Sequence, residues 1–320
     1  MAYRDLDDTN KMIEASAKPG GSAVVIGGGL LGLEAAAGLK LRGMNVTVIH
    51  IMGHLMERQL DPAAGYLLQK ELTSRGIHVH CKGATKAILG HDRVEAVALE
   101  DGTIYPADIV VMVVGIRPET RLATDAHLEV GRGVVVSDQM VTSDPNILAV
   151  GECVEHNKQL FGLVARIYDQ AKVVAKTLAD EQAAFQPVQT ATKLKVTGCN
   201  LFSAGDFADS DTREDIVFRD PSRGVYKRLV IENDKLIGAV MYGDTADGNW
   251  FFGLIKDGTD IAPMRDTLIF GPAFQKGATG GMSADPLAAV AALPPEAEIC
   301  GCNGVCKGKI VTAIAGGART

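Results

Sequence analysis

A run of glycines near the N-terminus most strongly constrains the fold of this chain. Residues 24–32 read Val-Val-Ile-Gly-Gly-Gly-Leu-Leu-Gly, and an apolar, alanine-rich stretch follows. This order predicts a short buried strand, a tight turn and a helix start, with the spacing Gly-x-Gly-x-x-Gly. Such glycines let the backbone approach a pyrophosphate, to which the helix N-terminus offers free N–H groups. The alternative is a purely structural glycine turn. We therefore expect a dinucleotide site formed by six residues: Gly27, Gly28, Gly29, Leu30, Leu31 and Gly32.

The composition narrows the range of partners. The 320 residues are enough for about two domains, and 47% hydrophobic residues suit a sizeable core. A net charge of −7 without a basic run argues against nucleic acid and anionic membrane surfaces as partners. No apolar run reaches the roughly 18 residues that span a bilayer, and the polar N-terminus lacks a signal peptide. We expect a cytoplasmic protein.

Strand and helix patterns alternate after Ser22, which predicts an α/β fold with a doubly wound parallel sheet, as in a Rossmann-like NAD(P)-binding domain. Asp101-Gly102 is a hairpin signal within this region. Later short strands predict a small C-terminal α+β domain. The expected strands are 23–26, 46–49, 77–80, 94–99, 103–106, 108–114, 193–196, 226–231 and 236–241, and the expected helices are 31–42, 62–75 and 165–178.

A second nucleotide signature lies at Thr142–Glu152. There a polar turn leads into a short apolar strand, expected at Ile147–Val150, that stops at Gly151-Glu152. Ligands of α/β sheets bind at the carboxyl ends of strands. An acid at this place accepts a hydrogen bond from a sugar hydroxyl, and the glycine lets the backbone approach. Gly151 and Glu152 are therefore candidate cofactor contacts.

Three polar residues near the first signature are further candidates. His50 ends the second strand, where NAD enzymes usually carry an acid for the ribose 2′-hydroxyl. A histidine is no anion and tolerates a 2′-phosphate when protonated, so the choice between NADH and NADPH stays open. Arg58 is a candidate phosphate ligand, with a solvated helix-face residue as the alternative. Glu34, expected in the first helical turn, either meets the nicotinamide side or simply caps the helix.

The six cysteines are unevenly placed. Cys81, Cys153 and Cys199 are each isolated in the sequence, and we expect them to be small buried residues rather than catalytic thiols. Cys300 and Cys302, with Cys306 close behind, crowd into one glycine-bearing turn. In a cytosolic chain such crowding indicates a metal before a disulfide, and three free thiols are the alternative.

Three segments resemble signatures of the two-dinucleotide-binding flavoprotein reductases: Gly27–Glu34, Val114–Pro118 and Thr142–Glu152. The resemblance implies that the first marks the NAD(P) domain and that the second, with Gly115, marks the crossing between domains. The third is the late FAD contact, where Glu152 replaces the usual Asp. Because the flavin carries the hydride chemistry, we expect no catalytic side chain.

A finer resemblance covers nearly the whole chain. The chain resembles the large subunit of assimilatory NAD(P)H-dependent nitrite reductase and the related nitrate reductase electron-transfer subunit. The resemblance implies electron flow from NAD(P)H to FAD, to a [2Fe-2S] cluster on Cys300 and Cys302, and onward to the sirohaem and [4Fe-4S] centre of a longer parent. It also implies the small subunit or other reductase domains as partners. The segments that carry it are His50–Met52, Leu55–Asp61, Gly151–His156, Lys193–Val196, Leu201–Phe207 and Cys300–Gly308.

The resemblance also predicts the domain organisation. Too few residues precede Gly27 for the first FAD-binding unit, and neither the second cysteine pair nor a sirohaem region is present, so we expect a fragment of a longer reductase. Trp250 with Phe251 and Phe252 are core or homodimer-interface candidates. The alternatives are a rubredoxin- or ferredoxin-reductase-like flavoprotein, and a truncated nucleotide-binding fragment without turnover. The expected segments are a lead-in at 1–18, an NAD(P)-binding domain at 19–115, the C-terminal half of an FAD-binding domain at 116–185, a small α+β domain at 190–271, a linker at 272–295 and a truncated [2Fe-2S] segment at 296–320.

Overall fold

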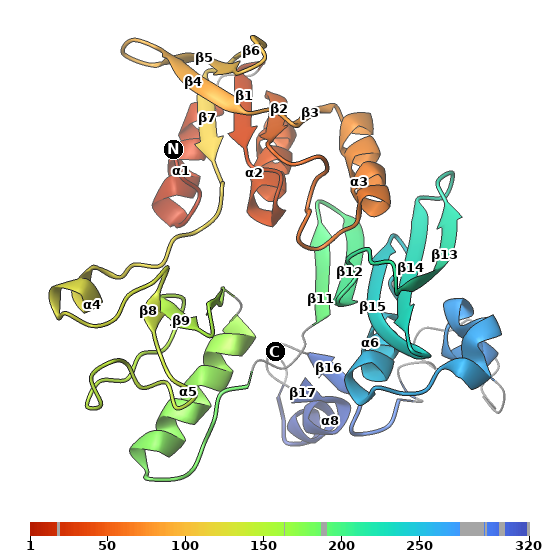
Figure 1. Cartoon of the computed structure of the whole chain (residues 1–320). Helices are drawn as coiled ribbons and strands as arrows, with labels where there is room; N and C mark the ends of the chain where they lie inside the picture. Colours follow the sequence, from red (N-terminus) through yellow and green to blue (C-terminus); the bar gives the residue numbers. More distant parts are fainter. Residues whose placement is uncertain are drawn as a thin grey trace. The chain divides into compact units, whose positions relative to one another are not determined.

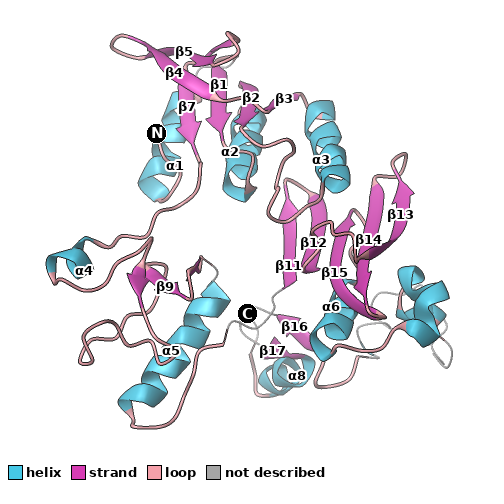
Figure 2. Cartoon of the chain, in the orientation of Figure 1, coloured by secondary structure: helices cyan, strands magenta, loops and turns pink. Residues whose placement is uncertain are grey.

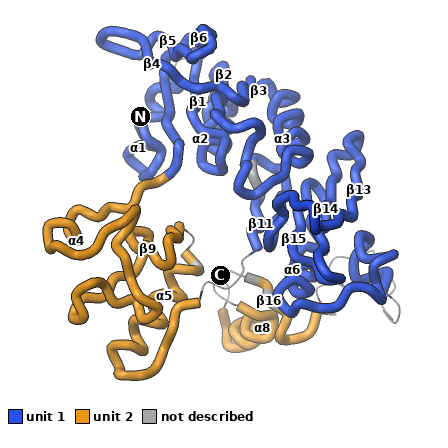
Figure 3. Tube along the Cα trace, in the orientation of Figure 1, with its two compact units in different colours: residues 1–115, 189–279 blue, residues 116–188, 280–320 orange. Residues whose placement is uncertain are grey.

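The computed structural model describes residues 1–17, 20–162, 164–186, 191–275, 291, 293–300 and 305–318. The chain divides into two compact units, drawn in different colours in Figure 3. One unit joins Met1–Gly115 to Gln189–Thr279, and the other contains Ile116–Val188 and Gly280–Thr320. The boundaries of the six predicted segments stay predictions.

A four-stranded parallel sheet forms the centre of the first unit (Figure 1). Its order is β3-β2-β1-β7, so the strand before the glycine turn lies in the interior of the sheet. The predicted α/β fold with a Rossmann-like sheet is confirmed. Its strands are β1 (Ser22–Ile26), β2 (Asn45–His50), β3 (Ile77–Cys81) and β7 (Ile109–Met112).

The two faces of this sheet are covered differently. Successive residues of a strand point to opposite faces, so Val25 packs with the helices while Val24 and Ile26 pack on the other side. The second face is covered by an antiparallel sheet whose β5–β6 hairpin turns at Asp101-Gly102, as predicted. The helices are α1 (Leu6–Ala15), α2 (Leu30–Leu41) and α3 (Pro62–Ser74), and the antiparallel strands are β4 (Thr85–Gly90), β5 (Val94–Leu99) and β6 (Ile104–Pro106).

The segment expected as a lead-in is packed onto the parallel sheet. Asp5 caps α1 by accepting a hydrogen bond from the Asp8 N–H at 2.8 Å. Met12 of α1 is buried in the same apolar cluster as α2. The Met1 ammonium donates to the Val110 carbonyl at 2.7 Å, at the edge strand of the sheet. The N-terminal residues therefore belong to the first unit.

A five-stranded antiparallel sheet, order β11-β12-β15-β14-β13, completes the first unit (Figure 2). This confirms the small C-terminal α+β domain, although β12 and β13 were not predicted. Phe251 of α6 is fully buried in its core, against which Trp250 and Phe252 pack, and a homodimer stays a prediction. The elements are β11 (Ala191–Val196), β12 (Cys199–Gly205), β13 (Glu214–Asp220), β14 (Val225–Glu232), β15 (Lys235–Tyr242), α6 (Gly248–Asp257) and the 3₁₀ helices η1 (Ala262–Phe270) and η2 (Pro272–Phe274).

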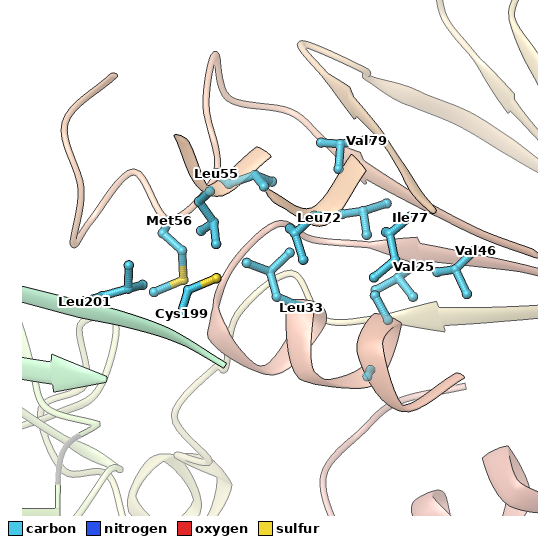
Figure 4. Packing of buried hydrophobic residues seen from close by; sticks show 14 of the residues in the cluster. Val25, Leu33, Val46, Leu55, Met56, Leu72, Ile77, Val79, Cys199 and Leu201 are labelled. Atoms are coloured by element: carbon cyan, nitrogen blue, oxygen red, sulfur yellow. The ribbon is translucent and has the colours of Figure 1, made fainter. Parts of the chain in front are cut away.

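The two sheets of the first unit share one apolar core. Figure 4 shows Cys199 and Leu201 of β12 beside Met56 and Leu33 of the nucleotide-binding half. A buried polar contact lies at the same junction. Asp61 caps α3, and its other carboxylate oxygen accepts a hydrogen bond from the Tyr226 hydroxyl of β14 at 2.6 Å.

Residues 116–186 of the second unit form a small three-stranded sheet, order β10-β9-β8, beside a long helix. The predicted strand at Ile147–Val150 is wrong: only Leu148 forms a bridge, with Val141. The segment instead folds back on residues 140–142: the Thr142 N–H donates to the Ile147 carbonyl, and the Ala149 N–H donates to the Met140 carbonyl. The elements of the second unit are α4 (Arg121–Asp125), β8 (Val134–Val135), β9 (Val154–His156), β10 (Gln159–Leu160), α5 (Val164–Leu178), β16 (Glu298–Cys300), β17 (Val305–Cys306) and α8 (Lys307–Ala315).

The Tyr226–Asp61 contact predicts a pH-dependent loss of stability. Burial, and then the hydrogen bond to Asp61, raise the pKa of Tyr226 above its ordinary value of 10.0. The stability that this pKa shift contributes to the folded state is complete below pH 10 and is lost as the pH rises further. At pH 8 we expect Tyr226→Phe to lower the free energy of unfolding by about 1–3 kcal/mol, because a buried carboxylate loses a donor. Denaturant titrations at pH 8 and above pH 10 test this, since the deficit should narrow at the higher pH.

Tyr66→Phe is the matched control, because Tyr66 is 55% exposed on α3. We expect its unfolding free energy to follow that of the unaltered chain at both pH values. A Tyr226→Phe deficit that is absent at pH 8, or that grows above pH 10, contradicts the interpretation.

Candidate dinucleotide-binding site

Gly27 and Gly32 each allow a close backbone approach at the end of β1. Gly27 has φ +123°, and a Cβ there would lie 2.1 Å from the Val113 carbonyl oxygen. A Cβ on Gly32 would lie 2.0 Å from the Gly27 carbonyl oxygen. Neither position accepts a side chain: Gly32 allows the close helix-on-strand packing predicted for the motif, and Gly27 allows the close approach of the segment that follows β7.

The third glycine leaves the helix start open. Gly29 is the N-cap of α2 and makes no side-chain capping bond. A Cβ on Gly29 would meet no atom within 4 Å. The first N–H groups of a helix have no intrahelical acceptor, so those of Leu30 and Leu31 are suited to receive phosphate oxygens. This open cradle fits the pyrophosphate of a dinucleotide.

Gly28 is held from the inside of the fold by His50. Its N–H donates to His50 Nδ1 at 3.1 Å. A Cβ on Gly28 would lie 2.6 Å from Leu55 Cδ2 and 2.7 Å from His50 Cγ, which explains the glycine. His50 is only 6% exposed, and its Nε2 pairs with Glu57 Oε2 at 3.0 Å. The glycine spacing gave no sign of Gly28's contact with His50, and Glu57 was not a predicted site residue.

The remaining candidates near this cradle are exposed. Arg58 lies on the turn before α3, not on a helix face. Glu34 is exposed and lies beyond the first turn of α2, which holds no acidic residue; this corrects its expected place. Gly115 has φ +103° and is the last residue before the chain enters the second unit.

The second signature is organised by a buried amide. The Gly151 N–H donates to Gln170 Oε1 at 2.9 Å, and Gln170 is completely buried on α5. Gly151 has φ +118°, and a Cβ there would meet no atom within 4 Å. The Gln170 Nε2 has no hydrogen-bond partner within the described ranges. An open glycine beside an unsatisfied buried donor fits a polar cofactor, and Glu152 follows at once, half-buried.

Residues 2–193 match the sequence profile of the pyridine nucleotide-disulphide oxidoreductases. The chain belongs to this family. Residues 191–259 also match the rubredoxin NAD+ reductase C-terminal domain. Membership of the pyridine nucleotide-disulphide oxidoreductases implies FAD and NAD(P)H as cofactors, which agrees with the two glycine sites.

Relatives extend the similarity over almost the whole chain. A nitrite reductase [NAD(P)H] of Bacillus subtilis is 45% identical over 98% of this chain and 38% of the relative. The assimilatory nitrate reductase electron transfer subunit of the same organism is 35% identical over 98% of this chain and 39% of its own length. The chain thus spans less than two thirds of either relative. A crystal structure of a ferredoxin reductase from Rhodopseudomonas palustris superposes with a TM-score of 0.69 at 27% identity, covering 77% of this chain and 62% of the other.

The predicted metal ligands lie largely outside the described residues. Cys302 belongs to the range 301–304, and the Cys300 side chain is likewise not described. Cys306 is a free, half-buried thiol at the start of α8. Within the described residues no group of three His, Cys, Asp or Glu side chains could hold a metal ion. No described helix is long and apolar enough to cross a membrane.

Because the helix start at Gly29 is open, we expect Gly29→Asp to weaken NADH binding without lowering the thermal stability of the chain. An Asp at the N-cap satisfies the helix start and meets no steric obstacle, so we expect the melting temperature to hold or rise slightly. Its carboxylate would occupy the phosphate position and repel the ligand. We expect NADH affinity, measured by fluorescence titration, to fall at least about 10-fold.

Gly38→Asp is the control, since a Cβ on that exposed residue of α2 also meets no atom. It introduces the same charge further along the helix. Unchanged NADH affinity in Gly29→Asp, or an equal loss in Gly38→Asp, contradicts the placement of the pyrophosphate.

Proposed function

We propose that this chain is the NAD(P)H-oxidising, FAD-dependent electron-transfer part of an assimilatory nitrite reductase. The open Gly29 cradle at the start of α2 carries the proposal, because its unhindered glycine and uncapped helix start suit the pyrophosphate of a dinucleotide. The similarity to nitrite reductase and to the nitrate reductase electron-transfer subunit along 98% of the chain supports the choice of parent.

Each glycine site has its own role in this proposal. The cradle from Gly27 to Gly32 binds the nicotinamide dinucleotide, and Gly151 with Glu152 contacts FAD. When bound, FAD accepts a hydride from NAD(P)H and passes the electrons onward. The chain's own residues bind and orient the cofactors, and no side chain has to take part in proton transfer.

The remaining features of the proposal concern the longer parent. Cys300 and Cys302 are two of the four thiolates that a [2Fe-2S] cluster takes. The sirohaem and [4Fe-4S] centre, and the reduction of nitrite to ammonium, belong to the parent. We expect the small subunit or other reductase domains as partners, a homodimer, and a cytoplasmic location.

A rubredoxin- or ferredoxin-reductase-like flavoprotein is the second candidate. The match of residues 191–259 to the rubredoxin NAD+ reductase C-terminal domain favours it, as does the fold shared with a ferredoxin reductase. The domain match ends at residue 259, before the cysteine-bearing segment that begins at Glu298, and the ferredoxin reductase covers 77% of the chain, whereas the two Bacillus subtilis relatives match 98% of it. We therefore rank this candidate second.

A visible absorption spectrum tests the proposal directly. We expect the chain to bind added FAD with a yellow flavin band, and anaerobic NADH or NADPH to bleach that band stoichiometrically. Gly29→Asp should keep the flavin band but lose the bleaching at low NADH. A bound flavin that neither nucleotide reduces contradicts the proposal. A colourless chain that still binds NADH indicates a nucleotide-binding fragment without turnover, and rapid NADH-driven reduction of rubredoxin favours the second candidate.

A further inference from the structure

The place of the usual ribose-binding acid is taken here by a histidine that faces inward. Hydrogen-bond donors and acceptors fix its tautomer: the Gly28 N–H donates to Nδ1, so Nδ1 is unprotonated and Nε2 carries the proton. The Nε2–H then donates to Glu57 Oε2 at 3.0 Å. Both ring nitrogens of His50 are used, so the ring has no polar atom left for a ligand.

Glu57 is the solvent-facing end of the hydrogen-bonded link that runs from Gly28 through His50 to Glu57. Its side chain is 27% exposed, whereas that of His50 is 7% exposed. Among the described residues only His50 bonds to the Glu57 carboxylate, which leaves the other oxygen available as an acceptor. Glu57 also lines a cavity of about 440 Å³, with Arg58 and Asp209 among its neighbours. The Glu57 carboxylate therefore faces an accessible space, and the buried His50 ring fixes its position by a hydrogen bond.

The link places this carboxylate close to the pyrophosphate cradle. Gly28 belongs to the loop that receives the phosphates, and a single imidazole ring with two hydrogen bonds joins it to Glu57. The adenosine ribose of a dinucleotide is bonded directly to the pyrophosphate. A ribose beside the cradle thus comes within reach of Glu57.

We propose, resting on the dinucleotide-binding function above, that Glu57 accepts the adenosine ribose hydroxyls and selects NADH over NADPH. A carboxylate accepts hydrogen bonds from the 2′-hydroxyl and repels a 2′-phosphate. His50 is a positioning residue, because it holds Glu57 and the Gly28 backbone with one ring.

Arg58 is the opposing feature, since an exposed cation beside the site favours a 2′-phosphate. No ion pair or hydrogen bond fixes its side chain within the described part of the chain. Ordering a free arginine on binding costs side-chain entropy, whereas the Glu57 carboxylate is already held in place. The preorganised carboxylate therefore decides the selectivity.

Dissociation constants for NADH and NADPH test the proposal in the full chain. We expect the unaltered chain to prefer NADH, and Glu57→Gln to weaken NADH binding about 10-fold while NADPH binding holds or tightens. Glu95→Gln, on the exposed side of β5, removes the same charge far from the cradle and should leave both constants unchanged. Circular dichroism and the melting temperature confirm that each variant is folded.

His50→Asn tests the positioning role separately. Asparagine keeps an acceptor near the Gly28 N–H but is too short to reach Glu57. We expect a folded variant that still binds NADH and whose NADH/NADPH preference falls as in Glu57→Gln. A merely structural role of His50 would weaken both nucleotides equally and leave the preference intact.

The outcomes separate this inference from the proposed function. NADH binding that Glu57→Gln changes by less than about twofold overturns the inference alone. The inference is also overturned if the unaltered chain prefers NADPH and Arg58→Gln abolishes that preference. It is likewise overturned if His50→Asn folds and keeps the full preference for NADH. Failure of the folded, unaltered chain to bind either nucleotide overturns the proposed function and the inference together.

Discussion

The nucleotide-binding half depends on how closely α2 approaches β1. That approach is possible because Gly32 lacks a side chain, since a Cβ there would lie 2.0 Å from the Gly27 carbonyl oxygen. The close packing brings the helix N-terminus to the carboxyl edge of the sheet, in the open space beside Gly29. Helix dipole and N–H groups then converge at a point that no side chain fills. One steric constraint thus creates both the fold and the site.

The backbone of this loop is used in two directions. The N–H groups at the start of α2 point to the place of the ligand, whereas the Gly28 N–H points inward to His50. A buried N–H needs an acceptor, and the histidine at the end of β2 supplies it. The loop is therefore fixed from behind before any ligand arrives, which lowers the ordering cost of binding.

The sequence predicted those features that depend on local chemistry. The glycine turn and the Asp101-Gly102 hairpin are encoded by residues close together in the chain, and the parallel sheet follows from the alternation of strand and helix patterns. The strand prediction at Ile147–Val150 was wrong because this segment closes a tight loop with residues 140–142, and Ile147 and Val150 are each 38% exposed. β12 and β13 were missed although each forms a hairpin with a neighbouring strand, β11 or β14. β12 contains the weak strand formers Asn200 and Gly205, and β13 is largely exposed, so neither shows the apolar alternation of a half-buried strand.

The candidate site was likewise predicted only where it depends on local sequence. The glycines that make the cradle could be read from their spacing, whereas the link from Gly28 through His50 to Glu57 could not. That link depends on which way one ring faces, and the same histidine facing outward would be a ligand contact. A polar aromatic residue ending a buried strand, with an acid seven positions later, was the only signal.

The position of Asp61 bears on how the first unit unfolds. One of its oxygens caps α3 and the other accepts from Tyr226 of the antiparallel sheet, while Cys199 and Leu201 of that sheet lie in the core beneath α2. Opening the start of α3 would therefore remove the acceptor of the Tyr226 hydroxyl, and removing the second sheet would expose part of the shared core. Because both sheets lie in one compact unit and share that core, we expect them to unfold together, so that the nucleotide cradle has the stability of both.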